Sequence, residues 1–287
     1  MAVYERAYRG YSGNVTPEWS RFLVLPRYGL QSIFASRFFL AFFVACFIPV
    51  LALLIMIYVS HNAKVLQLLG ATPGDMTLID APLFMAFLAF EGKFLGFLLA
   101  LIVGPALISP DMLNNALPLY LSRPFNRTEY ILGKLSVLVL LLSVITWVPY
   151  LMLFALQAYM SGWEWTQARL YIPVAIFVGS WAWILSLSLI SLAVAAVFKR
   201  KLWARVFLFV TLSALGAFGA ILAEGLGLWF GHNLNVFQMN VVIWGELFRA
   251  PVQPAPPLWS AWATLILACA VSLWILYRKV RAYEVIR

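Results

Sequence analysis

Six apolar stretches, each close to the length that crosses a bilayer, constrain this chain more than any other feature. A helix needs about 20 mostly apolar residues to span the hydrocarbon core, and lipid offers no partner for an open strand edge. We therefore expect an all-α integral membrane protein. Its six transmembrane helices are predicted at 38–58, 92–109, 135–158, 173–198, 206–223 and 258–277, with 82–90 as an outward extension of the second.

The composition excludes an ordinary soluble domain. Hydrophobic residues make up 64% of the chain and charged residues 11%, whereas soluble domains average about 45–50% apolar and about 25% charged residues. The formal net charge of +9 would suggest nucleic-acid binding in a soluble protein. Here membrane topology explains it better, so we expect a lipid bilayer and no nucleic acid as a partner.

The loops that alternate along the chain differ sharply in Lys and Arg. Cytoplasmic loops of membrane proteins carry an excess of these residues. We therefore place both termini in the cytoplasm and the chain, as a multi-pass protein, in a bacterial or archaeal cytoplasmic (inner) membrane. The cations assigned to the cytoplasm are Arg6, Arg9, Arg21, Arg27, Arg37, Arg123, Arg127, Lys134, Lys199, Arg200, Lys201, Arg205, Arg278, Lys279, Arg281 and Arg287; those opposite are Lys64, Arg169 and Arg249, with Lys93 near a helix end.

The segment 225–248 is long enough to be a seventh crossing, which would move the basic C-terminal tail outside. Its polar residues make it costly to place in hydrocarbon. We expect instead an outward re-entrant segment between helices 5 and 6, with its non-helical parts buried in protein or hydrated. The polar residues in question are His232, Asn233, Asn235, Gln238, Asn240 and Glu246.

Before the first apolar stretch, residues 17–37 mix aromatic, aliphatic and arginine side chains. This mixture is typical of a helix that lies in the headgroup plane, and we expect Pro26 and Gly29 to break it into two pieces. The chain then divides into an N-terminal tail with this interfacial helix (1–37), a transmembrane domain (38–277) and a basic tail (278–287).

The loop between the second and third apolar stretches has its own helical pattern. Ser109 can cap a helix, Pro110 suits its first position and Asp111 suits the positive end of its dipole. Pro118 is expected to kink or end this helix, and a second helix is expected to start around residues 126–129. Leu113, Leu117, Tyr120 and Leu121 recur at near-helical spacing, flanked by Arg123 and Arg127.

With these features together, the chain resembles the permease subunit of an ABC-2 type ATP-binding cassette transporter. The resemblance rests on the acidic helix start, the Ala116-Leu117 step, the run Ser-Arg-Pro-Phe-Asn-Arg at 122–127, and Tyr-Ile-Leu-Gly-Lys at 130–134. Residues 27–38 are similar to the connecting helix of that family. The chain departs from the family in having Asp111, Asn114-Asn115 and Ala116 where a Glu-Arg pair and a Gly-Thr step are common.

The resemblance implies six membrane helices, a cytoplasmic coupling helix between the second and third, and an outward hairpin between the fifth and sixth. The sequence contains no phosphate-binding loop of the Gly-x-x-x-x-Gly-Lys-Ser/Thr type, so ATP and Mg would be bound by two copies of a separate ATPase subunit. The chain itself is expected to bind no cofactor. A second permease, identical or paralogous, would complete the path. The residues that would couple to the ATPase are Asp111, Leu113, Leu117, Tyr120, Leu121, Arg123 and Arg127.

A second group of candidates belongs to the outer face, as a gate or substrate region: Glu91, Lys93, His232, Asn233 and Glu246. We expect Glu91 and Lys93 at the outer boundary of helix 2, with Lys93 reaching the interface. A substrate or proton site at these two residues is the alternative. Gly179 and the serines of the fourth stretch are expected to permit close helix packing.

Two other functions compete with transport. A membrane-embedded enzyme would need paired carboxylates, a Ser/His pair or a His-rich metal cluster within the spans, and the sequence offers none, so no catalytic or metal site is expected. A membrane anchor or assembly subunit of an envelope complex stays open. The resemblance favours export of a hydrophobic or amphipathic molecule without specifying which.

Overall fold

The computed structural model describes residues 23–62, 65, 79–121, 126–252 and 256–280, and it is 87% helical with no strand in those ranges. Six helices are long and apolar enough to cross a membrane, which confirms the all-α class and indicates a multi-pass membrane protein. In chain order these long helices run over Arg37–Ser60, Ala81–Leu113, Arg127–Ser161, Tyr171–Val197, Lys201–Gly225 and Leu258–Lys279.

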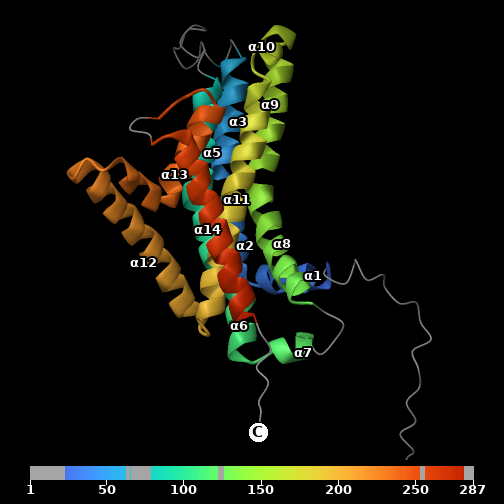
Figure 1. Cartoon of the computed structure of the whole chain (residues 1–287). Helices are drawn as coiled ribbons and strands as arrows, with labels where there is room; N and C mark the ends of the chain where they lie inside the picture. The colour runs from blue at the N-terminus through green and yellow to red at the C-terminus, as the bar shows by residue number, and fades with distance from the viewer. Residues whose placement is uncertain (1–22, 63–64, 66–78, 122–125, 253–255, 281–287) are drawn as a thin grey trace, which may run out of the picture.

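Several of the long helices consist of more than one element (Figure 1). The elements are α2 (Arg37–Ala45) with α3 (Ile48–Ser60), α5 (Ala81–Phe90) with η2 (Glu91–Gly96) and α6 (Phe97–Leu113), α8 (Arg127–Ile145) with α9 (Trp147–Ser161), α11 (Tyr171–Val197), α12 (Lys201–Ala220) with η3 (Ile221–Gly225), and α14 (Leu258–Lys279). The shorter ones are α1 (Val24–Phe34), α7 (Leu117–Leu121), α10 (Trp163–Ala168), η4 (Trp229–Leu234) and α13 (Val236–Leu247).

Proline explains the breaks in the first and third long helices. A proline inside a helix cannot donate to the carbonyl four residues earlier, and its ring clashes with that carbonyl. The element α2 ends at Ala45, four residues before Pro49, and α8 ends at Ile145, four residues before Pro149. Both helices resume within a few residues, so each crosses in two pieces.

The second long helix begins at Ala81 and continues to Leu113. The outward extension through 82–90 is therefore confirmed, whereas the predicted end at residue 109 is too early. At 1.5 Å per residue its 33 residues extend about 50 Å. Its middle segment, η2, has π-helical hydrogen bonding, a local widening that is frequent at functional sites.

The element α11 lies at the centre of the bundle and contacts α6, α8, α9, α13 and α14. Small residues allow this close packing. A Cβ at Gly104 of α6 would overlap the side chain of Ser191, and one at Gly179 would overlap the indole of Trp244 from α13. The prediction that Gly179 and the serines of this helix serve packing is confirmed at Gly179 and Ser191.

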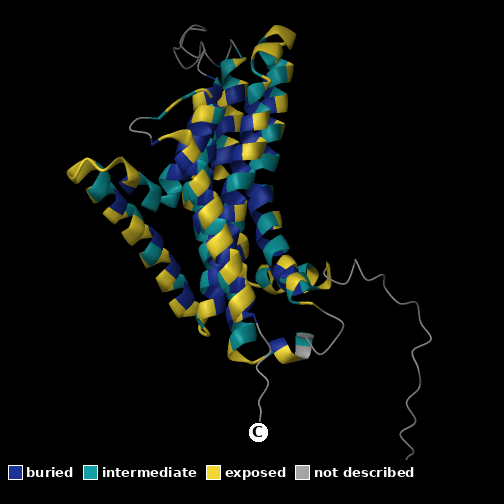
Figure 2. Cartoon of the chain, viewed as in Figure 1, coloured by how far each residue is buried: buried dark blue, intermediate teal, exposed yellow. Residues whose placement is uncertain are grey.

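The element α12 leaves the bundle at an angle and exposes most of its surface (Figures 1 and 2). After it, η3 and η4 turn the chain back, and α13 packs on α11 and α14. Residues Met239–Gly245 of α13 are buried, so much of the segment 225–248 is helical and covered by protein.

The element α1 lies across the lower end of the bundle, as Figure 1 is drawn, and packs on α8. It runs unbroken through Pro26 and Gly29, so the expected break is wrong. Pro26 occupies the first turn, where no helical bond needs its N–H. Gly29 faces the side chains of Val137 and Leu107, within 3.4 Å of where a Cβ would lie.

Candidate functional site

Two small elements, α1 and α7, gather at the lower end of the molecule, where the described chain also ends (Figure 1). The helix α7 connects the second and third long helices and lies below them. The expected helix start at Ser109 and Pro110 is wrong, because both residues continue α6, which ends at Leu113. Ser109 is fully buried, and its hydroxyl donates to the carbonyl of Ala195 at 3.2 Å.

A reversal of the backbone separates α6 from α7. Asn114 ends α6, and Asn115 has a positive φ of 48°, a conformation that asparagine tolerates better than most residues. Pro118 then stands in the first turn of α7, where proline is tolerated. It therefore begins a helix here and does not end one, contrary to the sequence expectation.

Asp111 connects the second long helix to the third. Its carboxylate accepts a hydrogen bond from the Tyr130 hydroxyl at 2.7 Å and pairs with the Lys134 ammonium at 2.8 Å. The Lys134 side chain is 11% exposed and that of Asp111 16%, so water screens the pair little. Asp111 therefore holds the end of α6 on α8 and does not stand at the start of a separate helix.

The predicted ridge of α7 is not a single exposed face. Leu113, the last residue of α6, is 52% exposed, whereas Leu117 is 4% exposed and points into the protein. Tyr120 is half-buried with its ring 5.7 Å from that of Tyr130; burial, and then the charge of Asp111, raise the pKa of its hydroxyl. Arg123 and the side chain of Leu121 lie outside the described residues.

The third long helix starts where the sequence predicts. Arg127 is its first residue, and Asn126 is the capping residue before it. The Asn126 backbone N–H donates to the Glu129 carboxylate at 2.9 Å, which is half of a capping box. Arg127 is half-buried at this end.

A half-open cavity of about 630 Å³ lies at the lower end, between α1, the start of α2, α6, α7 and α12. Its wall is partly apolar, with Leu25, Ile33, Phe39 and Leu107, and partly charged. The charged residues on its lining are Asp111, Lys134, Lys201 and Arg205. Such a site suits a molecule that has both an apolar part and an anionic or polar part.

Arg205 connects the helix α12, which leaves the bundle at an angle, to α6 of the bundle. Its guanidinium donates from Nη2 to the carbonyl of Ile102 at 2.8 Å, while its buried Nε has no hydrogen-bond partner in the described part of the chain. Lys201, one turn earlier, is exposed. Arg205 therefore has a donor left over beside the cavity that it lines.

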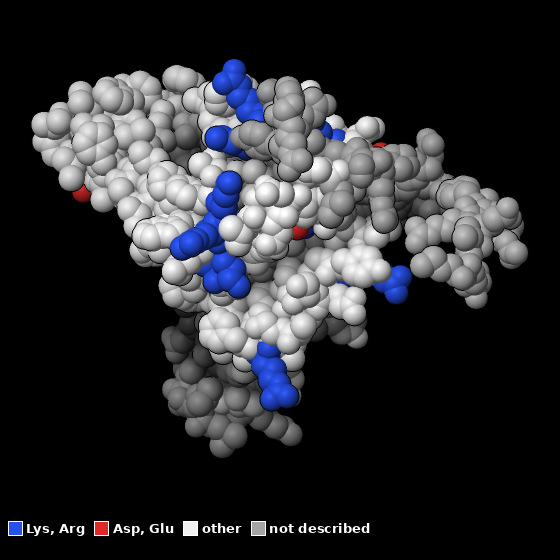
Figure 3. Space-filling model, turned by 90° about the horizontal axis from the view of Figure 1, so that it is seen from below, with Lys and Arg blue, Asp and Glu red and all other residues white. Residues whose placement is uncertain are grey.

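Lys and Arg side chains cluster on this lower face, with few acidic ones between them (Figure 3). The exposed cations here come from the ends of several helices: Arg27, Arg37, Lys199, Arg200, Lys201, Arg278 and Lys279. At the opposite end the described cations are Arg169 and Arg249.

The residues predicted as an outer-face gate do not form one cluster. Glu91 is fully buried within η2 and not at the boundary of helix 2, because the ten residues of α5 precede it; Lys93 is half-buried in the same segment. His232 lies in η4, Asn233 accepts a hydrogen bond from Ser260 of α14 at 3.3 Å, and Glu246 is exposed on α13. No hydrogen bond or ion pair joins two of these five side chains within the described ranges.

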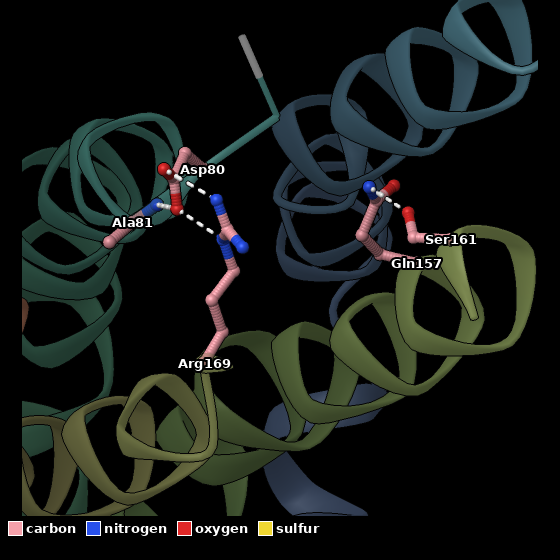
Figure 4. Close-up of polar contacts among 5 residues, drawn as sticks. All are labelled: Asp80, Ala81, Gln157, Ser161 and Arg169. Carbon is pink, nitrogen blue, oxygen red and sulfur yellow. Dashed lines mark hydrogen bonds and ion pairs between the residues drawn. The ribbon is translucent and has the colours of Figure 1, made fainter. Parts of the chain in front are cut away.

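Sequence reasoning missed the ion pair at the upper end. Arg169 donates to both carboxylate oxygens of Asp80, at 2.8 and 3.2 Å (Figure 4). The hydrogen bond from Arg169 lowers the pKa of Asp80, and the same bond raises the pKa of Arg169. Asp80 precedes α5 and Arg169 precedes α11, so the pair fixes the start of one helix beside the start of another. Their separation by 89 residues hides this contact from any local pattern.

Comparison with known proteins gives no identification. No protein-family model matches the sequence, and no curated protein matches it significantly.

Proposed function

We propose that this chain is the permease subunit of an ABC-2 type transporter, and that it moves a hydrophobic or amphipathic molecule across the cytoplasmic membrane. A separate ATPase subunit, present in two copies, would supply the energy. The observation that carries the proposal is the placement of α1 and α7 at one end of a six-helix chain, beside an amphipathic cavity.

The charge distribution supports a cytoplasmic position for that end. Exposed Lys and Arg side chains surround α1 and the lower ends of the long helices, as the positive-inside rule requires of cytoplasmic loops. The termini and α7 would then lie on the side where an ATPase is available. In this orientation η4 and the start of α13 belong to a re-entrant segment on the outer face.

The coupling surface of the proposal is the end of α6 with the start of α7. Leu113 and Pro118 are exposed there, while Asp111 and its partners Tyr130 and Lys134 make the connection to the third long helix rigid. A movement of the ATPase at Leu113 would thereby reach two long helices together. ATP binding can favour one arrangement of the helices only through its different affinity for the two states.

Co-purification with an ABC ATPase, if one is encoded next to this chain, tests the proposal. We would compare the wild type with Leu113→Asp, which puts a charge on the exposed coupling surface without disturbing a buried contact. Residues at the centre of an interface lose their contact with water, so a charge at position 113 would be costly to bury. We therefore expect binding to weaken about tenfold or more, with an equal loss of ATPase stimulation.

Leu170→Asp is the matched control, because Leu170 is exposed to a similar extent at the opposite end of the molecule. It should leave the complex intact. If both variants bind the ATPase as the wild type does, or if no ATPase binds, the coupling surface is refuted and a membrane anchor or assembly subunit becomes the better explanation.

A further inference from the structure

Glu91 is a carboxyl group enclosed by protein inside a long apolar helix. Its exposed fraction is 0%, and neither carboxylate oxygen has a hydrogen-bond partner among the described residues. Ten residues of α5 separate it from the start of the helix, about 15 Å along the axis. The whole helix is about 50 Å long and the hydrocarbon core about 30 Å thick, so in a centred spanning arrangement Glu91 lies within the core, nearer its upper boundary than its middle.

The backbone around Glu91 is also unusual. Glu91 begins η2, and the next residue, Gly92, uses its carbonyl to accept a hydrogen bond from the Trp183 indole at 2.9 Å. A Cβ at Gly92 would lie 2.7 Å from the ring of Trp244, and the same indole lies against Gly179. Trp244 of α13 is therefore wedged between the second and fourth long helices, against the residue that follows Glu91.

The titratable residues around Glu91 come from several elements. Cys46, from the break in the first long helix, and Tyr150 of α9 are close enough to interact electrostatically with it. The Tyr150 hydroxyl also has no hydrogen-bond partner in the described chain. Trp183 of α11 and Trp244 of α13 both contact Gly92, the next residue. The acidic residue of α13, Glu246, is exposed. Lys93, on the same segment, makes no ion pair with Glu91.

An ionised carboxylate without a partner is among the costliest groups to bury, whereas a protonated one is neutral and loses far less. A metal ion would need several oxygen ligands, and the pocket offers a single carboxylate. The site is also closed to solvent, because Glu91 is fully buried. The ligand that fits the enclosed site is a proton.

We propose that Glu91 is an intramembrane proton-binding site that α13 closes through Trp244. With Trp244 in place, the carboxyl group keeps its proton. When α13 withdraws, water reaches the group, the O–H bond breaks, and the proton passes to water while the electron pair stays on the carboxylate. This step involves no oxidant or reductant, and it does not depend on the proposed transport function.

Infrared spectroscopy of the purified chain in lipid nanodiscs tests the site directly, because the C=O stretch of a protonated carboxylic acid is distinct from carboxylate bands. We expect such a band at neutral pH, where an exposed glutamate with a pKa of about 4.3 is ionised. Glu91→Gln should remove the band. Glu164→Gln is the matched control; Glu164 is exposed on α10, and its replacement should remove carboxylate intensity only.

The closing role of α13 has its own test. Trp244→Ala should admit water, so that the carboxylic acid band disappears at neutral pH and returns only on acidification. Should Trp244→Ala fail to fold, Trp244→Phe should still accelerate exchange of the acid proton for deuterium. A wild-type spectrum without an acid band that depends on Glu91 overturns the site; a band that neither Trp244 variant alters overturns the closure. Neither result bears on whether an ATPase binds.

Discussion

The elements α11 and α12 follow one another in sequence, are both long and apolar, and have opposite surroundings. In the most apolar 18-residue stretch of each helix, 67% is buried within the protein for α11 and 17% for the helix that contains α12. The difference is in side-chain size at the contacts. On α11, the small residues Ser191 and Gly179 meet Gly104 of α6 and the Trp244 ring of α13 closely. On α12, the large side chains of Phe207, Phe209 and Val210 are exposed.

Lipid tails are as apolar as leucine, so apolarity alone does not hold helices together in a membrane; close packing and hydrogen bonds do. The helix α11 has both, since its Ser191 hydroxyl donates to the Ala100 carbonyl at 2.8 Å. The contact of α12 with α6 has one such hydrogen bond, from Arg205 to the Ile102 carbonyl, and a stacked pair of rings, Phe97 and Phe209. We therefore expect a substitution of the same kind to reduce stability more at a contact of α11 than on α12.

The largest effect is expected at the contact between α6 and α11. In Gly104→Leu the new side chain would occupy the position of Ser191, and overpacking of this kind costs about 1–3 kcal/mol or more. We expect a clear fall in the thermal unfolding midpoint in detergent. Ala214→Leu, on the exposed side of α12, is the control and should change the midpoint little; equal losses in both variants would remove the contrast.

The same substitution, tryptophan to phenylalanine, can be compared on the two helices. Trp183→Phe on α11 leaves the buried Gly92 carbonyl without its indole donor, and an unsatisfied buried group costs about 1–3 kcal/mol. Trp203→Phe on α12 affects a side chain that is 59% exposed and should cost little. Denaturation of both variants in the same detergent measures the difference, which we expect to favour Trp203→Phe.

The features that could be predicted from the sequence are those set by residues close together along one helix. The number of long helices, the cap before Arg127 and the small residues of α11 follow from local composition. The burial of Glu91 and Leu117 does not, because it depends on the helices that cover them. The tryptophan that packs against Gly92, next to Glu91, is at residue 244, and no spacing rule relates positions so far apart. Likewise, Ser109-Pro110 has the local pattern of a helix start. In the structure the buried Ser109 hydroxyl donates instead to the distant Ala195 carbonyl of α11.

A smaller effect should follow from loosening the attachment of α12. Arg205→Met keeps the apolar stem and removes the hydrogen bond to the Ile102 carbonyl; a bond to a charged group contributes about 1.5–3 kcal/mol when buried, and less here because Arg205 is half-exposed. We expect faster amide hydrogen exchange at the start of α12 with the rest of the bundle unchanged. Lys201→Met, one turn away and exposed, should leave exchange as it is. Protection unchanged in Arg205→Met would mean that other contacts hold α12.

The smallest expected effect is a dependence of stability on pH, which should differ between the upper ends of the two helices. The Asp80–Arg169 pair precedes α11, while Glu224 of the α12 helix makes no ion pair in the described part of the chain. Because the bond from Arg169 lowers the pKa of Asp80 from its ordinary value of 3.8, the stabilisation is fully present above that value and is lost as the pH falls through the lowered pKa. The pair is partly exposed, so about 0–1 kcal/mol is expected. At neutral pH, Asp80→Asn should have a slightly lower unfolding midpoint than the wild type; in strong acid the two midpoints should be equal. Glu224→Gln, the control, should match the wild type at both pH values. A difference for Asp80→Asn that persists in acid would assign the effect to packing instead of the ion pair.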